Sequence, residues 1–227
     1  MGMLQTLISC LSTCHPEANP AYYGGQFNYK CQDERDTHIH RILGQAPSIA
    51  AACLRIHQGQ EIIQPNISLS YAENFLAMTL GPDSRMTKNS KIVHALETVF
   101  ILHAEHEMQC STAAMRHMAS SMADVYVSLS GALTSLYGPR HGGGLEAVFH
   151  MLEDIGTIEN VANYVQQIKR KERMLMGFGH RAYSNNDPRA VIIKQLAMEI
   201  FEITGKEDLI KVAKELERVV VTDEFFI

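Results

Sequence analysis

Apolar residues recur along most of this chain with the spacing of α-helices. Near the N-terminus, Leu4, Leu7 and Leu11 repeat at intervals of three and four residues. Residues 92–100 and 125–136 carry comparable apolar stripes. This spacing places apolar side chains on one face of a helix, whereas strands alternate with a period of two, and no sustained alternation or hairpin signature is present. The pattern predicts an all-α protein.

Local signals mark where several helices begin. Ser70 and Glu73 have the spacing of a capping box, which closes the first turn of a helix. Asp187 followed by Pro188 predicts a capping carboxylate and a proline at the first helical position. Pro47 is interpreted as a helix start as well. Expected helices include residues 48–57, 145–152, 158–168, 190–203 and 209–220.

Composition argues against several classes of function. The chain has 227 residues, of which 46% are hydrophobic and 20% charged, as in ordinary globular proteins. Its formal net charge of −5 argues against a nucleic-acid-binding protein, because such proteins neutralise phosphates with Lys and Arg. No apolar run approaches the ~20 residues that a membrane-spanning helix needs. We therefore expect neither a nucleic-acid partner nor a membrane span.

The five cysteines show no framework spacing. Their odd number favours reduced thiols in an intracellular compartment, either the cytoplasm or the mitochondrial matrix. Cys10, Cys14, His15 and Cys31 contain ligand types that zinc uses, but no paired CxxC spacing supports a site. The residues after Met1 have neither a basic segment nor a small-residue cleavage site, so we expect no signal peptide there.

Two glycine-rich turns each carry a histidine. His141 follows a proline in YGPRHGGG, and His180 follows two glycines in MGFGHRAY. Glycine lets the backbone take unusual angles and approach a ligand closely. A histidine at such a break can offer its imidazole to a substrate in a cleft, and the alternative is a solvated histidine in an ordinary turn. Two such turns in one helical chain favour the first interpretation.

Three further features add candidate residues. His103 and His106 are three residues apart, which predicts that they share one helix face; a metal site there lacks a third ligand, so we expect a hydrogen-bond donor instead. Arg189 stands at a predicted helix start, where it either clamps a carboxylate or is solvated. The basic run at residues 169–173 either meets phosphates of a nucleotide-like cofactor or, more often, is a solvated helix end.

The order of these motifs resembles the citrate synthase family. The similarity extends from Met3 to about Phe226. It implies a multi-helical fold in which residues 1–141 form part of a large domain and residues 142–227 form a small domain, usually within a homodimer. The segments that carry the resemblance are HAEHE (103–107), YGPRHGGG (137–144), MGFGHRAYSNNDPR (176–189), APSIAAACLR (46–55) and residues 70–80.

The resemblance also implies a role for each candidate residue. His141 would hydrogen-bond the thioester carbonyl of acetyl-CoA and stabilise the enolate, and His180 would donate a hydrogen bond to the carbonyl of oxaloacetate. His106 and Arg189 would bind oxygens of oxaloacetate and citrate. No metal and no permanently bound cofactor is implied, because acetyl-CoA itself supplies the activated acyl group. The backbone that would pass along the CoA adenine consists of Leu175, Met176, Gly177, Phe178 and Gly179.

The chain departs from the family pattern in two respects. The proton-abstracting aspartate of the family lies in a PNVDF-like motif whose position comes after the final residues DEFFI, and Asp223 and Glu224 precede that position. The resemblance therefore implies a fragment that lacks the N-terminal part of the family and this catalytic aspartate. We expect no synthase activity from the 227 residues alone. In addition, GGGLEA at residues 142–147 replaces the more usual GGANEA.

Several functions are compatible with these observations. The first expectation is the condensation of acetyl-CoA with oxaloacetate and water to citrate and CoA, a step of the tricarboxylic acid cycle. A 2-methylcitrate synthase would use propionyl-CoA, and one methylene changes binding by only ~1–3 kcal/mol, although GHRAY is nearer to citrate synthases. Citrate-cleaving lyase modules share the fold. From other classes, a truncated non-catalytic paralogue acting as a dimerisation partner and a metalloprotein built on HAEH are the alternatives.

Overall fold

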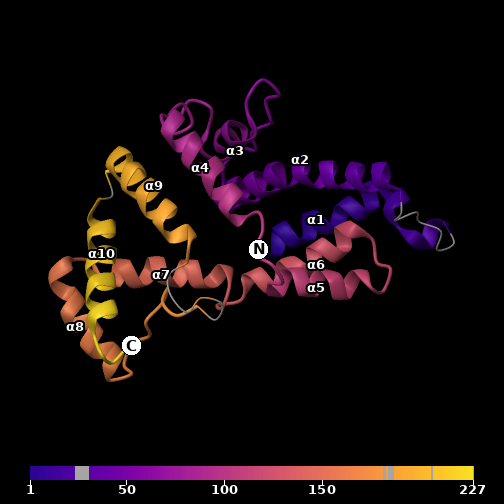
Figure 1. Cartoon of the computed structure of the whole chain (residues 1–227). Coiled ribbons are helices and arrows are strands. Elements are labelled where there is room, and N and C mark those ends of the chain that lie inside the picture. The colour runs from indigo at the N-terminus through magenta and orange to yellow at the C-terminus, as the bar shows by residue number, and fades with distance from the viewer. Residues whose placement is uncertain (24–30, 181–182, 184–186, 206, 227) are drawn as a thin grey trace. The chain divides into compact units, whose positions relative to one another are not determined.

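The chain is helical in the part that the structure describes. The structure is a computed structural model, and it describes residues 1–23, 31–180, 183, 187–205 and 207–226. No strand occurs in these ranges, which confirms the all-α prediction (Figure 1). The helices are α1 (Gly2–Cys14), the 3₁₀-helices η1 (Pro16–Ala18) and η2 (Pro20–Tyr23), α2 (Gln32–His57), α3 (Tyr71–Leu80), α4 (Ser90–His103), α5 (Cys110–Ala119), α6 (Val125–Tyr137), α7 (Gly142–Ile155), α8 (Ile158–Lys169), α9 (Arg189–Thr204) and α10 (Glu207–Thr222).

Both predicted capping signals act at helix starts. The Glu73 N–H donates to the Ser70 hydroxyl at 3.4 Å, and the Ser70 N–H donates to the Glu73 carboxylate at 2.8 Å, so the capping box ahead of α3 is confirmed. Asp187 accepts from the Arg189 N–H at 2.9 Å and caps α9 as predicted. Pro188 occupies the N-cap, one position before the predicted one.

Pro47 lies inside a helix, so its interpretation as a helix start is wrong. α2 runs without interruption from Gln32 to His57. Proline has no N–H, and within a helix it leaves the carbonyl four residues earlier without its usual donor. That carbonyl belongs to Leu43, and the Tyr71 hydroxyl donates to it at 3.1 Å. A side chain from the start of α3 thus supplies the missing hydrogen bond and lets α2 continue.

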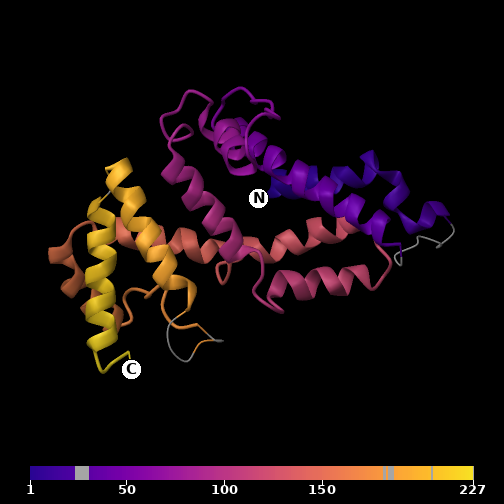
Figure 2. The same cartoon turned by 45° about the horizontal axis from the view of Figure 1, so that its top comes forward.

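The chain divides into two compact units, Met1–Tyr137 and Gly138–Ile227. In the first unit α1 packs against α2 and α6, α6 packs against α5, and α3 packs against α2 and α4. In the second unit α10 packs against α7, α8 and α9. The pairing of α5 with α6 and of α9 with α10 is visible in both views (Figures 1 and 2). The division into family domains at residues 1–141 and 142–227 stays a prediction.

Each unit has its own hydrophobic core. In the first unit the core contains Ile8 and Leu11 of α1 together with Tyr126 of α6, whose side chain has no exposed surface. In the second unit the core is contributed by α7, α8 and α10, and α9 places no residue in it. The buried residues of this second core are Met151, Ile155, Val161, Tyr164, Val165, Ile168, Val212, Leu216 and Val220.

A polar cluster lies within the core of the first unit. The Tyr126 hydroxyl and the Nδ1 atom of His38 are 2.9 Å apart, and His38 is only 6% exposed. The ring of His15 stacks on Tyr126 with centroids 5.3 Å apart. Arg41, one turn beyond His38 on α2, forms an ion pair with Glu17 at 2.5 Å. The cluster therefore ties α2 and the end of α1 to α6.

Burial and neighbouring charges act on the same histidine of this cluster. Burial lowers the pKa of His38 by disfavouring its charged form, and the positive charge of Arg41 lowers it further, with a smaller lowering from His15. The carboxylates of Glu17 and Glu34 act in the opposite direction but do not reverse the shift. The folded unit therefore favours the neutral form of the His38 imidazole.

Candidate functional site

His141 lies directly before α7, near the start of the second unit. The backbone turns after Gly138, the first residue of this unit, and the His141 N–H donates to the Gly138 carbonyl at 3.1 Å. His141 is the N-cap residue of α7, with φ −131° and ψ −113°, and its side chain is exposed. The first turn of a helix presents N–H groups without intrahelical partners. The histidine thus stands beside a helix N-terminus with its side chain exposed.

The glycines after His141 are helical rather than unusual in conformation. Residues 142–144 form the first turn of α7 and none has a positive φ, so these glycines do not use the unusual angles that glycine permits. Space explains the glycine at position 144. A Cβ atom there would lie 3.2 Å from the Pro139 carbonyl oxygen, which is tighter than an ordinary contact.

The loop of residues 175–179 lies on α7. Gly177 and Gly179 have φ values of 83° and 73°, a region that side chains other than glycine rarely adopt. The Met176 N–H donates to the sulfur of Met151 at 3.4 Å. Leu175, Met176 and Phe178 are partly buried against the core of the second unit. The loop therefore has a defined backbone path with its apolar side chains turned to the core.

His180 and Arg189 are linked through intervening residues. The rings of His180 and Tyr183 lie 4.8 Å apart at 34°. The hydrogen bond to the Asp187 carboxylate is the largest cause that raises the pKa of the Arg189 guanidinium, and Tyr183 raises it further by a smaller amount. Residues 181–182 and 184–186 of the MGFGHRAYSNNDPR motif lie outside the described residues.

Arg189 is engaged by a carboxylate of its own chain. Its Nη2 and Nε atoms lie 2.7 Å and 3.0 Å from the two carboxylate oxygens of Asp187, a bidentate arrangement. Both side chains are about one quarter exposed. The guanidinium is therefore not simply solvated, because it is already paired with Asp187, which fixes its plane. Sequence reasoning found Asp187 as a helix cap but missed this second role, and it missed Tyr183.

His106 lies beyond the end of α4. The prediction that His103 and His106 share a helix face is wrong, because α4 ends at His103. His103 donates through Nδ1 to the Val99 carbonyl at 2.8 Å. The left-handed backbone of Glu107, with φ 54°, turns the chain directly after His106. In the described residues, no group of three His, Cys, Asp or Glu side chains could hold a metal ion.

The candidate residues fall in both units. His141, His180, Arg189 and residues 175–179 belong to the second unit, whereas His106 belongs to the first. Within the second unit, the loop that leads into His180 packs on the helix that His141 caps. The convergence of the histidines on one substrate stays a prediction.

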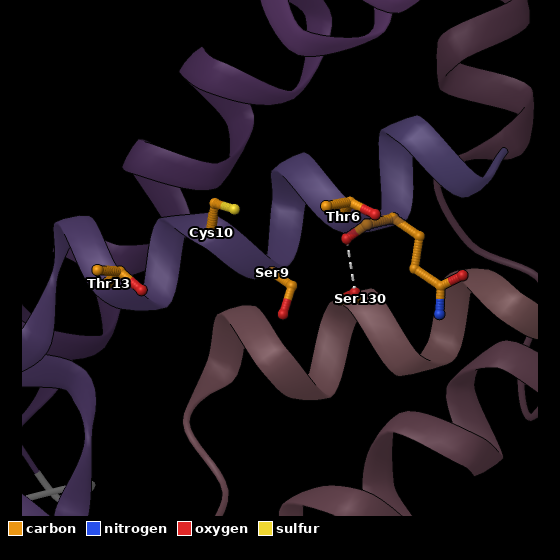
Figure 3. Close-up of a pocket in the computed structure, with 6 residues that line it drawn as sticks. Thr6, Ser9, Cys10, Thr13 and Ser130 are labelled. Atoms are coloured by element: carbon orange, nitrogen blue, oxygen red, sulfur yellow. Dashed lines mark hydrogen bonds between the residues drawn. The ribbon is translucent and has the colours of Figure 1, made fainter.

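An open pocket in the first unit contains none of these candidates. It has a volume of about 410 Å³ and lies beside α1 and α6. Figure 3 shows the Ser130 hydroxyl directed at α1, where it donates to the Gln5 carbonyl at 2.8 Å. The Gln5 amide donates to the Thr134 hydroxyl at 2.8 Å. Polar groups at this pocket thus hold two helices together. Its lining residues are Gln5, Thr6, Ser9, Cys10, Thr13 and Ser130.

Comparison with known proteins decides the family. The model of the citrate synthase C-terminal domain family matches residues 1–227, the whole chain. The chain belongs to the citrate synthase family. The citrate synthase motifs at residues 103–107, 137–144 and 176–189 all lie within the matched region. None of the described helices is both long and apolar enough to cross a membrane.

Relatives within the citrate synthase family match the full chain. The glyoxysomal citrate synthase of Cucurbita maxima is 49% identical over 228 residues, covering 100% of this chain and 44% of that protein. The peroxisomal citrate synthase of Dictyostelium discoideum is 49% identical over 230 residues, covering 100% of this chain and 46% of that protein. The chain spans about half the length of the relatives that it matches.

Solved citrate synthase structures share the fold. The citrate synthase of Pyrobaculum aerophilum superposes with a TM-score of 0.82 at 28% identity, covering 98% of this chain and 55% of that chain. The enzyme of Thermoplasma acidophilum, solved as a ternary complex with carboxymethyl coenzyme A and oxaloacetate, gives a TM-score of 0.80 at 27% identity. That superposition covers 95% of this chain and 54% of the other.

Proposed function

We propose that this chain carries the two catalytic histidines and the CoA-binding loop of a citrate synthase, which joins acetyl-CoA to oxaloacetate. The observation that carries the proposal is the whole-chain match to the family. In this chain His141 and His180 both lie outside helix interiors. The structural relative from Thermoplasma acidophilum binds a CoA derivative and oxaloacetate, the two ligand classes that the proposal requires.

His141 is proposed to stabilise the enolate of acetyl-CoA. Removing a weakly acidic proton beside a thioester needs a positioned base and a hydrogen-bond donor for the oxygen that becomes negative. The exposed imidazole of His141 at the N-cap of α7 is suited to the donor role. The first-turn N–H groups of α7 favour negative charge nearby.

Asp223 is a poor choice for the base. Its carboxylate forms an ion pair with Lys169 at 2.5 Å and accepts the N–H of Phe225 at 3.0 Å. The Lys169 hydrogen bond is the largest cause that lowers the Asp223 pKa, which weakens it as a proton acceptor. We therefore keep the family assignment, in which the base comes from a PNVDF-like motif and not from Asp223.

His180 and Arg189 are proposed to bind oxaloacetate, with His106 contributing from the first unit. His180 would donate to the ketone oxygen and so make the carbon electrophilic. Arg189 would contribute N–H donors from a plane already fixed by Asp187, with the N-terminus of α9 adding positive potential. Positioning of this kind supplies much of the rate of a two-substrate reaction.

CoA is proposed to bind as substrate and product along residues 175–179. The loop exposes backbone at Gly177 and Gly179 while its apolar side chains face the core, which leaves main-chain groups available to a nucleotide base. No resident metal or permanently bound cofactor is part of the proposal. A homodimer in an intracellular compartment is proposed as the working form, and the oligomeric state is testable by sedimentation.

The direct test of activity uses a chimaera. The 230-residue region of the Dictyostelium discoideum peroxisomal enzyme that matches this chain is replaced by the chain itself, and CoA release from acetyl-CoA and oxaloacetate is measured. We expect turnover, and we expect His141→Ala to reduce it by ~10²–10³-fold, the scale for losing an oxyanion donor. His150→Ala, at an exposed position on the same helix, should retain it.

Three outcomes would overturn or redirect this assignment. A folded chimaera without turnover contradicts the proposal, and full activity of the His141→Ala variant removes His141 from the mechanism. A higher kcat/KM with propionyl-CoA than with acetyl-CoA reassigns the substrate. Calorimetric measurement of CoA binding to the unmodified chain tests the loop independently of catalysis.

A further inference from the structure

The loop of residues 175–179 touches α7 at two points. At the first, the Met176 N–H donates to the sulfur of Met151, whose side chain is only 5% exposed. Sulfur is a weak acceptor, so the contact matters for where it places the backbone more than for its strength. Met151 itself is anchored in the core of the second unit.

At the second point the loop backbone passes directly over Val148. A Cβ atom built on Gly177 would lie 3.0 Å from Val148 Cγ2 and 3.8 Å from Cγ1. Gly179 has a similar backbone, with φ 73° against 83°, yet a Cβ atom there would meet none of the described residues within 4 Å. The two glycines therefore share one conformational requirement, and only Gly177 has a steric one.

These contacts and His141 are on the same rigid element. Val148 and Met151 are three residues apart, so they share one face of α7. His141 is the N-cap of that helix, seven residues before Val148. At 1.5 Å per residue, the helix sets a spacing of about 10 Å along its axis between His141 and the loop contact.

We propose that Val148 and Met151 are positioning residues that seat the loop of residues 175–179 on α7 and so fix its distance from His141. The inference rests on the proposed function, in which the loop binds CoA and His141 faces the thioester. The distance from the loop to His141 would then set how far a CoA molecule held by the loop must extend to bring its thioester to His141. Neither Val148 nor Met151 needs to touch the substrate.

The first test measures CoA binding to the 227-residue chain by calorimetry. Gly177→Ala and Gly179→Ala both introduce a side chain at a positive φ, but only the first places its Cβ tightly against the Val148 side chain. We expect Gly177→Ala to weaken binding about tenfold more than Gly179→Ala does, and Val148→Ala to recover at least about threefold in the Gly177→Ala background only. Equal losses in the two glycine variants, with no recovery, would overturn the proposal.

The second test needs no ligand. Hydrogen exchange of the Met176 amide is followed in the free chain, with Met151→Leu as a volume-conserving change that removes the sulfur acceptor. We expect exchange to accelerate by about tenfold, whereas Met174→Leu, at a 76% exposed position, should leave it unchanged. Unaltered Met176 exchange in the Met151→Leu variant contradicts the seating.

The two tests separate the seating of the loop from the proposed function. If the unmodified chain binds no CoA but the exchange result holds, the proposed function fails and the seating stands. If CoA binds and the exchange and glycine results both fail, the function stands and the seating does not.

Discussion

Replacing Tyr126 by Phe should destabilise the first unit by an amount that its contacts define. The ring of Tyr126 is fully buried and stacks on His15, and Phe preserves both features. The change removes the hydroxyl that lies 2.9 Å from Nδ1 of the buried His38. Leaving one buried polar group without its partner costs about 1–3 kcal/mol. The Tyr126 hydroxyl also accepts a hydrogen bond from Arg41, but Arg41 is one third exposed and can turn to water, so we assign no further loss to it.

Urea unfolding followed by far-UV circular dichroism measures this loss. We expect a lower midpoint at an unchanged m-value, with a reduction in unfolding free energy of about 1–3 kcal/mol. In a thermal scan the same loss corresponds to roughly 2–12 °C, at 2–4 °C per kcal/mol for a chain of this size. Tyr137→Phe is the matched control because Tyr137 is 70% exposed, and it should change stability by less than about 0.5 kcal/mol. A Tyr126→Phe variant as stable as this control would refute the reasoning.

Three further predictions follow from local contacts. Because the pKa of His38 is lowered in the folded state, the unfolded chain binds more protons at acidic pH. The free energy of unfolding should therefore fall as the pH drops below the ordinary histidine value of 6.5. Urea midpoints of a His38→Gln variant should lose that pH dependence. Ser70→Ala should lower the free energy of unfolding by about 0.5–2 kcal/mol through loss of the cap, and Ser68→Ala serves as the control in the same denaturation assay. Tyr71→Phe should cost about 0.5–1.5 kcal/mol because the Leu43 carbonyl loses its donor, and this cost should shrink in a Pro47→Ala background, where the helix N–H returns. An equal cost in both backgrounds would refute the link between these residues.

The helices could be predicted from sequence where the signal was local. The capping box at Ser70 acts over a few residues and operates as expected. Pro47 misled because its hydrogen-bond deficit is met by Tyr71, which is 24 residues away along the chain. No helix was predicted over α5, because Cys110–Ala119 carries mainly small residues and buries none of them.

The candidate residues could be chosen from the sequence pattern, but their contacts could not. Histidines beside glycine-rich turns could be selected from the pattern, and both histidines do lie outside helix interiors. The pairing of Arg189 with Asp187 was hidden because aspartate before proline already had an explanation as a helix cap. Tyr183 was missed because a lone tyrosine in a loop carries no spacing signal.

The two roles of Asp187 have an electrostatic consequence for the proposed reaction. One carboxylate caps α9 through the Arg189 N–H and fixes the guanidinium of the same residue. The plane of Arg189 is thereby set before any ligand arrives, which reduces the entropy lost on binding. The same contact offsets part of the arginine charge, which weakens the attraction of Arg189 for a dicarboxylate. The N-terminus of α9 supplies only about half a unit charge. In the proposed function, His180 and His106 therefore add hydrogen bonds to oxaloacetate that Arg189 alone does not supply.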